Sequence, residues 1–240
     1  MRNVYIEGIK KDDNITYRGL DSTRLTNVID AVFGIALTLL IFNISDTTSF
    51  AELKEFTKSF PALLISIVFL ILVWKENVLL VLVYSIRGMR LQLLNIVFIS
   101  LVIFYVHPLR YLTRLLTNLF FNTDIKLQIT ETEIPLLMMY YGIIAFSLYF
   151  TVFLSYVIIL KKKLLFNLNS YELIYTKYHA YRLLIMSVVP LLSAVLSVSL
   201  KGKSIFLASV IGGTVYGLYP ILISIWNRFY IKAKATEASR

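Results

Sequence analysis

The chain has 240 residues, of which 58% are hydrophobic and 16% are charged, and its mean hydropathy is +0.75. A water-soluble domain of this length needs a more highly charged surface, so the composition excludes the soluble class and indicates an integral membrane protein. The lack of cysteine excludes disulfides and thiolate metal sites, and two distant histidines do not suggest a zinc site. We explain the net charge of +10 by basic loops on one membrane face, not by nucleic-acid binding.

Continuous apolar runs, rather than alternating ones, predict an all-α polytopic fold with six transmembrane helices. The predicted spans cover residues 26–45, 60–84, 91–107, 135–160, 183–200 and 204–226. We therefore expect three parts: a polar N-terminal arm over 1–25, a six-span membrane domain over 26–226, and a basic tail over 227–240.

The segments between the spans contain three prolines that affect the predicted helix boundaries. Residues 46–59 are expected to form an exposed loop with a short helix inside it, and Pro61 is expected in the first turn of the second span. Pro108 is expected to end the third span, with an amphipathic interfacial helix after it. Residues 161–182 read as a polar, partly helical loop, and Pro190 predicts a kink in the fifth span.

Lys and Arg are unevenly distributed between the two sides of the predicted membrane domain. Seventeen of the 24 lie in the arm, the tail and the two loops on their side, and seven lie on the other side. The positive-inside rule therefore predicts that both termini are cytoplasmic. At the cytoplasmic end of the second span, we expect Lys75 and Glu76 to snorkel toward the headgroups, with Glu76 paired to a basic neighbour, rather than to form part of a proton relay.

The first span carries an acid near its N-terminal end. Asp30 follows Arg24 by six residues, so on a helix the two side chains are about 240° apart and each should find partners on other helices. An ion pair or cap at the membrane edge explains these residues without any function. An intramembrane acid that marks an ion pathway explains them equally well.

Further along this span, Ile35, Leu39 and Phe42 recur at i, i+4 and i+7, with Thr38 beside them. This spacing places them on one face of a helix. Helix packing or lipid contact ordinarily explains such a stripe, so its meaning depends on the rest of the span.

The first span resembles the first-helix signature of the transmembrane protein 175 family, whose members are potassium channels. The family pattern is Arg, three residues, Phe-Ser-Asp, and then a run close to AVFAIAITLL. Val28 and Ile29 replace the Phe and Ser of that pattern. The residues that match it are Arg24, Asp30, Ala31, Val32, Phe33, Ile35, Ala36, Thr38, Leu39 and Leu40.

The resemblance continues more weakly into the next two spans. Family members carry a Trp on the second helix, a His three residues later, and an Asn early in the third helix. Trp74 and Asn95 match two of these positions, and Asn77 stands at the His position. The resemblance implies that these side chains form a supporting network with Arg24 and Asp30.

The resemblance also implies a homotetramer in a bacterial plasma membrane, in which four first spans line a central pore for K⁺ or other monovalent cations. Rings of Ile35, Leu39 and Phe42 would form the constriction and filter, since apolar rings can gate by dewetting. Thr38 would hydrogen-bond between helices and set the ring diameter. The bilayer, the other three copies of the chain and the permeant ion are then the partners, with no bound cofactor.

Two other functions stay open at this point. A secondary transporter would use Asp30 to bind a coupling ion, but it predicts broken helices in matching halves, and only Pro190 and no internal repeat are found. A non-conducting membrane protein is compatible with Val28 and Ile29. An enzyme is not expected, because the sequence lacks clustered acids or a nucleophile with a nearby base.

Overall fold

The computed structural model describes residues 15–19, 24–42, 49–86, 88–121, 130–200 and 205–238. Within these ranges every regular element is a helix. The order is α2 (Arg24–Phe42), α3 (Phe50–Tyr84), α4 (Met89–Phe121), η1 (Glu131–Glu133), α5 (Ile134–Lys161), α6 (Ser170–Leu200), α7 (Ile205–Thr214), η2 (Val215–Gly217) and α8 (Leu218–Ala238). Six segments of the described chain are long and apolar enough to cross a membrane, which confirms the predicted all-α, six-span class.

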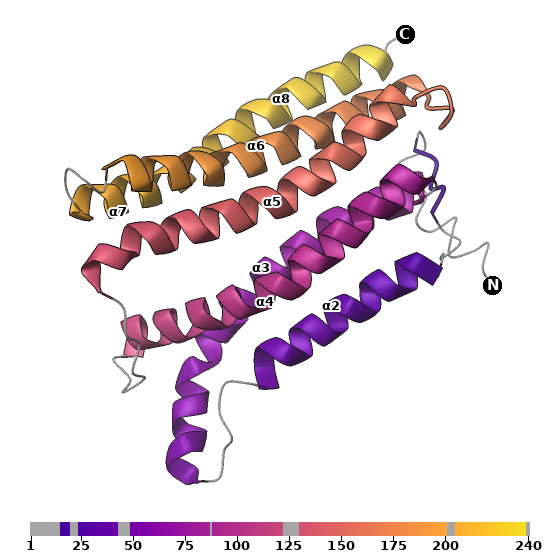
Figure 1. The fold of residues 1–240 in the computed structure, drawn as a ribbon. Coiled ribbons are helices and arrows are strands. Elements are labelled where there is room, and N and C mark those ends of the chain that lie inside the picture. The colour runs from indigo at the N-terminus through magenta and orange to yellow at the C-terminus, as the bar shows by residue number, and fades with distance from the viewer. Residues whose placement is uncertain are drawn as a thin grey trace.

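The helices form a bundle in which α2 lies at one edge (Figure 1). It packs against α3 and α4, while α5 packs along α6, and α7 and α8 cover α6. The start of α2 and the end of α8 lie at the same end of the bundle (Figure 1). This arrangement agrees with an even number of spans.

Helix α3 begins ten residues before its predicted start. Ser49 and Glu52 form a capping box: the Ser49 hydroxyl accepts from the Glu52 amide at 3.2 Å, and the Glu52 carboxylate accepts from the Ser49 amide at 2.9 Å. The short helix expected inside the 46–59 loop is therefore the first part of α3, and the prediction that it is separate from the second span is wrong. Pro61 lies inside the helix, where it removes the hydrogen bond to the Thr57 carbonyl, and the first turns of α3 point away from the rest (Figure 1).

Helix α4 continues through Pro108 to Phe121, so the prediction that Pro108 ends the third span is wrong. The expected interfacial helix is the last part of this same helix. Packing keeps it regular: the Thr113 hydroxyl shares a buried 2.7 Å hydrogen bond with Ser66 of α3. The Tyr141 hydroxyl also donates to the Pro108 carbonyl at 2.7 Å.

Helix α6 likewise includes most of the loop predicted over 161–182 and runs through Pro190. Proline at this position frees the Met186 carbonyl, which accepts a 2.8 Å hydrogen bond from the Tyr219 hydroxyl. The backbones of α5 and α6 approach closely at Gly142, where a Cβ atom would stand 2.5 Å from the Pro190 carbonyl oxygen. The sixth span is divided into α7, η2 and α8, and most of the predicted tail is helical as part of α8.

Candidate functional site: the exposed face of α2 and its supports

One face of α2 is buried in the bundle. Ile29, Phe33, Ala36 and Leu40 are each 4% exposed or less and belong to the main hydrophobic core. The Phe33 ring packs against Phe98 of α4, with ring centroids 6.0 Å apart. These residues recur at i, i+4, i+7 and i+11, the period of a single helix face.

The opposite face of α2 is exposed and carries three of the four predicted pore residues. Ile35 is 57% exposed, Leu39 is 37% exposed, and Thr38 is exposed between them. Phe42 is the last residue of α2, and its side chain lies outside the described part of the chain. The structure therefore places Ile35, Thr38 and Leu39 together, as the sequence spacing predicts.

Thr38 bonds within its own helix. Its hydroxyl donates to the Gly34 carbonyl at 2.9 Å. A hydroxyl that donates in this way keeps its oxygen lone pairs available on the exposed face. The predicted bond from Thr38 to the helix of a neighbouring subunit stays a prediction, since the structure describes a single chain.

Asp30 has a partner on α3, as predicted. The Trp74 indole N–H donates to the Asp30 carboxylate at 3.0 Å. Asp30 and Trp74 also line a cavity of about 320 Å³ between α2 and α3, together with Phe33 and Gly34. Arg24 is exposed at the start of α2, and among the described residues no ion pair joins it to Asp30.

Asn77 and Asn95 form a separate buried pair one turn further along α3. The Asn77 amide donates to the Asn95 side-chain oxygen at 2.9 Å, and both residues are 2% exposed or less. The Asn95 amide in turn donates to the Leu91 carbonyl at 3.0 Å. Four of the five residues that the resemblance groups together are thus joined as two pairs: Trp74 joins α3 to α2, and Asn77 joins α3 to α4.

Glu76 lies between these two positions and forms an ion pair with Arg182 of α6. One guanidinium nitrogen of Arg182 donates to both carboxylate oxygens. The prediction of a basic partner is confirmed, but the Glu76 side chain is only 9% exposed and points into the bundle. The partner is 106 positions away, and no local pattern around Glu76 identifies it.

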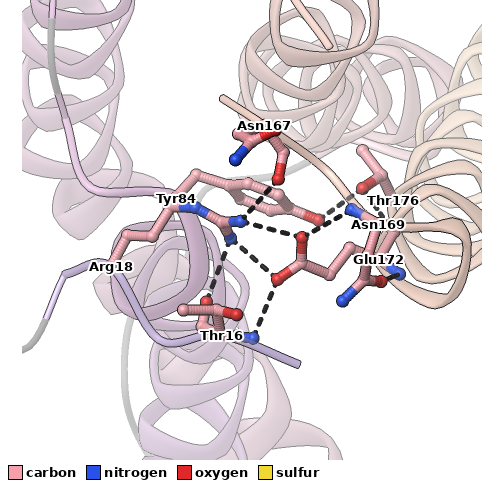
Figure 2. Close-up of polar contacts among 7 residues, drawn as sticks. All are labelled: Thr16, Arg18, Tyr84, Asn167, Asn169, Glu172 and Thr176. Atoms are coloured by element: carbon pink, nitrogen blue, oxygen red, sulfur yellow. Dashed lines mark hydrogen bonds and ion pairs between the residues drawn. The ribbon is translucent and has the colours of Figure 1, made fainter. Parts of the chain in front are cut away.

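A second ion pair, missed in the sequence, fastens the N-terminal arm (Figure 2). The Arg18 guanidinium donates to both oxygens of Glu172 at 2.9 and 2.8 Å, and the Glu172 side chain is fully buried. Arg18 also donates to the carbonyls of Thr16 and Asn167. The Thr16 and Asn169 amides complete the set of donors to the carboxylate at 2.8 and 3.0 Å.

The backbone of the arm is held as well. The amides of Arg18 and Gly19 donate to the carbonyls of Val83 and Leu82 at 3.2 and 2.9 Å. A Cβ atom on Gly19 would stand 1.8 Å from the Val81 carbonyl oxygen, so only glycine fits this approach. The Asn-x-x-Glu spacing at Asn169 is a helix-capping signal visible in the sequence, but nothing in it identifies Arg18 as a partner.

Comparison with known proteins agrees with the first-helix signature. A potassium channel of Marivirga tractuosa is 28% identical over an alignment of 240 positions, which covers 97% of each of the two chains. A crystal structure of a variant of the potassium channel MtTMEM175, in complex with a nanobody–MBP fusion protein, matches with a TM-score of 0.82 and 28% identity. That match covers 92% of this chain and 98% of the other.

No protein-family model matches the chain. Both relatives are described as channels rather than enzymes, in agreement with the expectation from the sequence. The similarity in sequence and in structure extends over nearly the whole length of the chain and is not confined to α2. The chain is a homologue, over nearly its whole length, of these two potassium channels.

Proposed function

We propose that the chain is a potassium-permeable channel that conducts as a homotetramer through a central pore lined by α2. The observation that carries this proposal is the division of α2 into two faces. Ile29, Phe33 and Leu40 anchor one face in the bundle, while the face with Ile35 and Leu39 meets no other part of the described chain closely enough to be buried. The relatives described as potassium channels align along the full chain.

The composition of the exposed face favours a pore over a lipid contact. Arg24, Asn27, Ile35 and Thr38 are all exposed and fall within an arc of about 80° at ~100° per residue. Polar side chains in contact with lipid tails are unfavourable, whereas a water-filled axis or a subunit interface satisfies them. Four copies of α2 around a symmetry axis provide both a water-filled axis and subunit interfaces for these side chains.

Conduction then depends on rings of apolar side chains. Ile35 and Leu39 are one turn apart, so in a tetramer they form two stacked rings separated by roughly 6 Å. An ion crosses such a constriction only after it sheds part of its hydration shell, and K⁺ holds its water less tightly than Na⁺. The rings therefore act as a gate by dewetting and as a filter by the cost of dehydration. Thr38 lies between them and supplies an oxygen lone pair to water, or to the neighbouring subunit.

The same proposal assigns the chain to a bacterial plasma membrane, with both termini in the cytoplasm. The excess of Lys and Arg on the side of the termini supports this orientation. The relative from Marivirga tractuosa is a bacterial protein, which supports the choice of membrane.

The test is ion flux into liposomes that contain the purified protein, with K⁺ and Na⁺ compared in matched gradients. Leu39→Ala should widen the ring and raise the flux or reduce the preference for K⁺. Leu192→Ala is the matched control, because Leu192 lies on α6 with a similar exposure of 43%. Unchanged flux for Leu39→Ala in an intact tetramer contradicts a pore position for Leu39. No flux from a wild-type tetramer favours the transporter or non-conducting alternative.

A further inference from the structure

A cavity of about 590 Å³ opens at the end of the bundle where the arm is fastened. Arg90, in the first turn of α4, and Lys162, the residue that caps the end of α5, both line it. Tyr84, Leu91 and Phe166 supply apolar walls. The cavity thus lies between two connections, the one from α3 to α4 and the one from α5 to α6.

The cations at this cavity differ in whether their charge is compensated. Arg18 also lines the cavity, but its guanidinium is bound to the buried Glu172 carboxylate (Figure 2). Arg90 and Lys162 are exposed, and neither has an ion-pair partner within the described ranges of the chain. Two positive charges therefore remain available at the cavity for an anion.

The backbone adds to this positive potential. The first intrahelical bonds of α4 run from the Leu91 and Gln92 amides to the Gly88 carbonyl, so the amides before them are not used by the helix. Gly88 itself lines the cavity. The positive end of the α4 dipole thus lies beside Arg90, an arrangement that favours a phosphate group.

The rim of the cavity is apolar and strongly exposed. Leu165 lines the cavity and is 78% exposed, and its neighbour Leu164 is 88% exposed. Both follow directly on Lys161, Lys162 and Lys163. Leucines beside lysines at the end of a transmembrane helix suit the boundary between headgroups and acyl chains, where the leucines face the acyl chains and the ammonium groups reach the phosphates.

We propose that this cavity is a binding site for an anionic phospholipid of the membrane leaflet on the side of the termini. Arg90 and Lys162 bind the headgroup phosphate, and Leu165 contacts the start of an acyl chain. The apolar rim selects a lipid over a free phosphate ion, because a soluble anion gains nothing from an exposed leucine. The proposal depends on the chain being a membrane protein and is independent of whether it conducts ions.

The experiment measures binding of phosphatidylglycerol and phosphatidylcholine to the delipidated full-length protein in detergent, by native mass spectrometry. Phosphatidylglycerol should bind more tightly than phosphatidylcholine. The double variant Arg90→Gln with Lys162→Gln should raise the Kd for phosphatidylglycerol by about thirtyfold, the effect of two basic residues near a membrane surface. Lys161→Gln with Lys163→Gln is the matched control, since it also removes two positive charges, from the residues on either side of Lys162, neither of which lines the cavity. Binding to this control should stay close to wild type.

Two further measurements separate the site from its alternatives. Leu165→Ser keeps both charges and should also weaken the binding of phosphatidylglycerol. It provides a second test if the Arg90→Gln, Lys162→Gln variant does not fold. Glycerol phosphate, added as a soluble competitor, should not displace the lipid at equal concentration. Equal weakening in both double variants, no weakening in Arg90→Gln with Lys162→Gln, or displacement by glycerol phosphate would each overturn the proposal.

Discussion

Arg18 and Glu172 are 154 positions apart in the sequence and are joined by two parallel hydrogen bonds, from Nη1 to Oε1 at 2.9 Å and from Nη2 to Oε2 at 2.8 Å. Glu172 lies in the first turn of α6, and Arg18 lies six residues before the start of α2. The pair therefore fixes the segment that leads into the proposed pore helix to the far half of the bundle. Paired geometry of this kind is stronger than a single charged contact.

Arg18→Gln should lower the stability of the folded protein by about 2–3 kcal/mol. The substitution leaves the buried Glu172 carboxylate with only the amides of Thr16 and Asn169 as donors. Thermal unfolding in detergent measures the loss. Lys163→Gln, which removes an exposed cation, serves as the control and should leave the unfolding temperature unchanged. Equal unfolding temperatures for Arg18→Gln and the control would show that the pair contributes nothing.

Gly19→Ala should detach the arm without unfolding the helices. The new methyl group would stand 1.8 Å from the Val81 carbonyl oxygen, so the 2.9 Å bond from the Gly19 amide to Leu82 must break. Hydrogen exchange measures this directly, as faster exchange over residues 15–19 with unchanged exchange in α3. Gly217→Ala is the control, because a Cβ atom there meets nothing within 4 Å. Continued protection of residues 15–19 in Gly19→Ala would contradict the close approach.

The number of spans was predictable because each needs a long apolar run, a property of the local sequence alone. The helix ends were not, and the two prolines show why. Local rules place Pro61 at a first turn and Pro108 at a helix end, but Ser49 caps α3 upstream of Pro61. Beyond Pro108, the buried bond of Thr113 to Ser66 holds α4 together. Tertiary contacts outweigh the local penalty of a proline.

At the candidate site, too, the features that depend on local sequence were predictable, and those that depend on contacts between distant helices were not. The common face of Ile35, Thr38 and Leu39 follows from their spacing, and the resemblance singles out Asn77 and Asn95. Only the structure shows that these two asparagines bond to each other. The partners of Glu76 and Glu172 were not predictable, because an acid that needs a cation can find it on any helix that the fold brings near. Only the packed bundle identifies Arg182 and Arg18 as those cations.

Trp74→Phe should loosen the contact between α2 and α3. It removes the 3.0 Å bond to the Asp30 carboxylate while it keeps an aromatic ring against the 320 Å³ cavity. A hydrogen bond to a charged group contributes about 1.5–3 kcal/mol, so both folded yield and the unfolding temperature should fall. Asp30→Asn keeps an acceptor oxygen and should be milder, whereas Asp30→Ala should match Trp74→Phe. Trp226→Phe is the matched control, because its indole bonds to the Tyr178 carbonyl on α6, away from α2.

Glu76 and Arg182 allow a test in which the single and double variants give different answers. Glu76→Gln leaves the Arg182 guanidinium, only 21% exposed, without its counter-ion, and should cost about 3–5 kcal/mol of folding stability. Arg182→Met leaves the more deeply buried carboxylate unpaired and should cost at least as much. The double variant Glu76→Met with Arg182→Met removes both charges, so it should be more stable than either single variant. Unfolding in detergent for all three proteins provides the cycle. If the stability lost in the double variant equals the sum of the losses in the two single variants, Glu76 and Arg182 do not stabilise each other. Each residue would then contribute through its own packing.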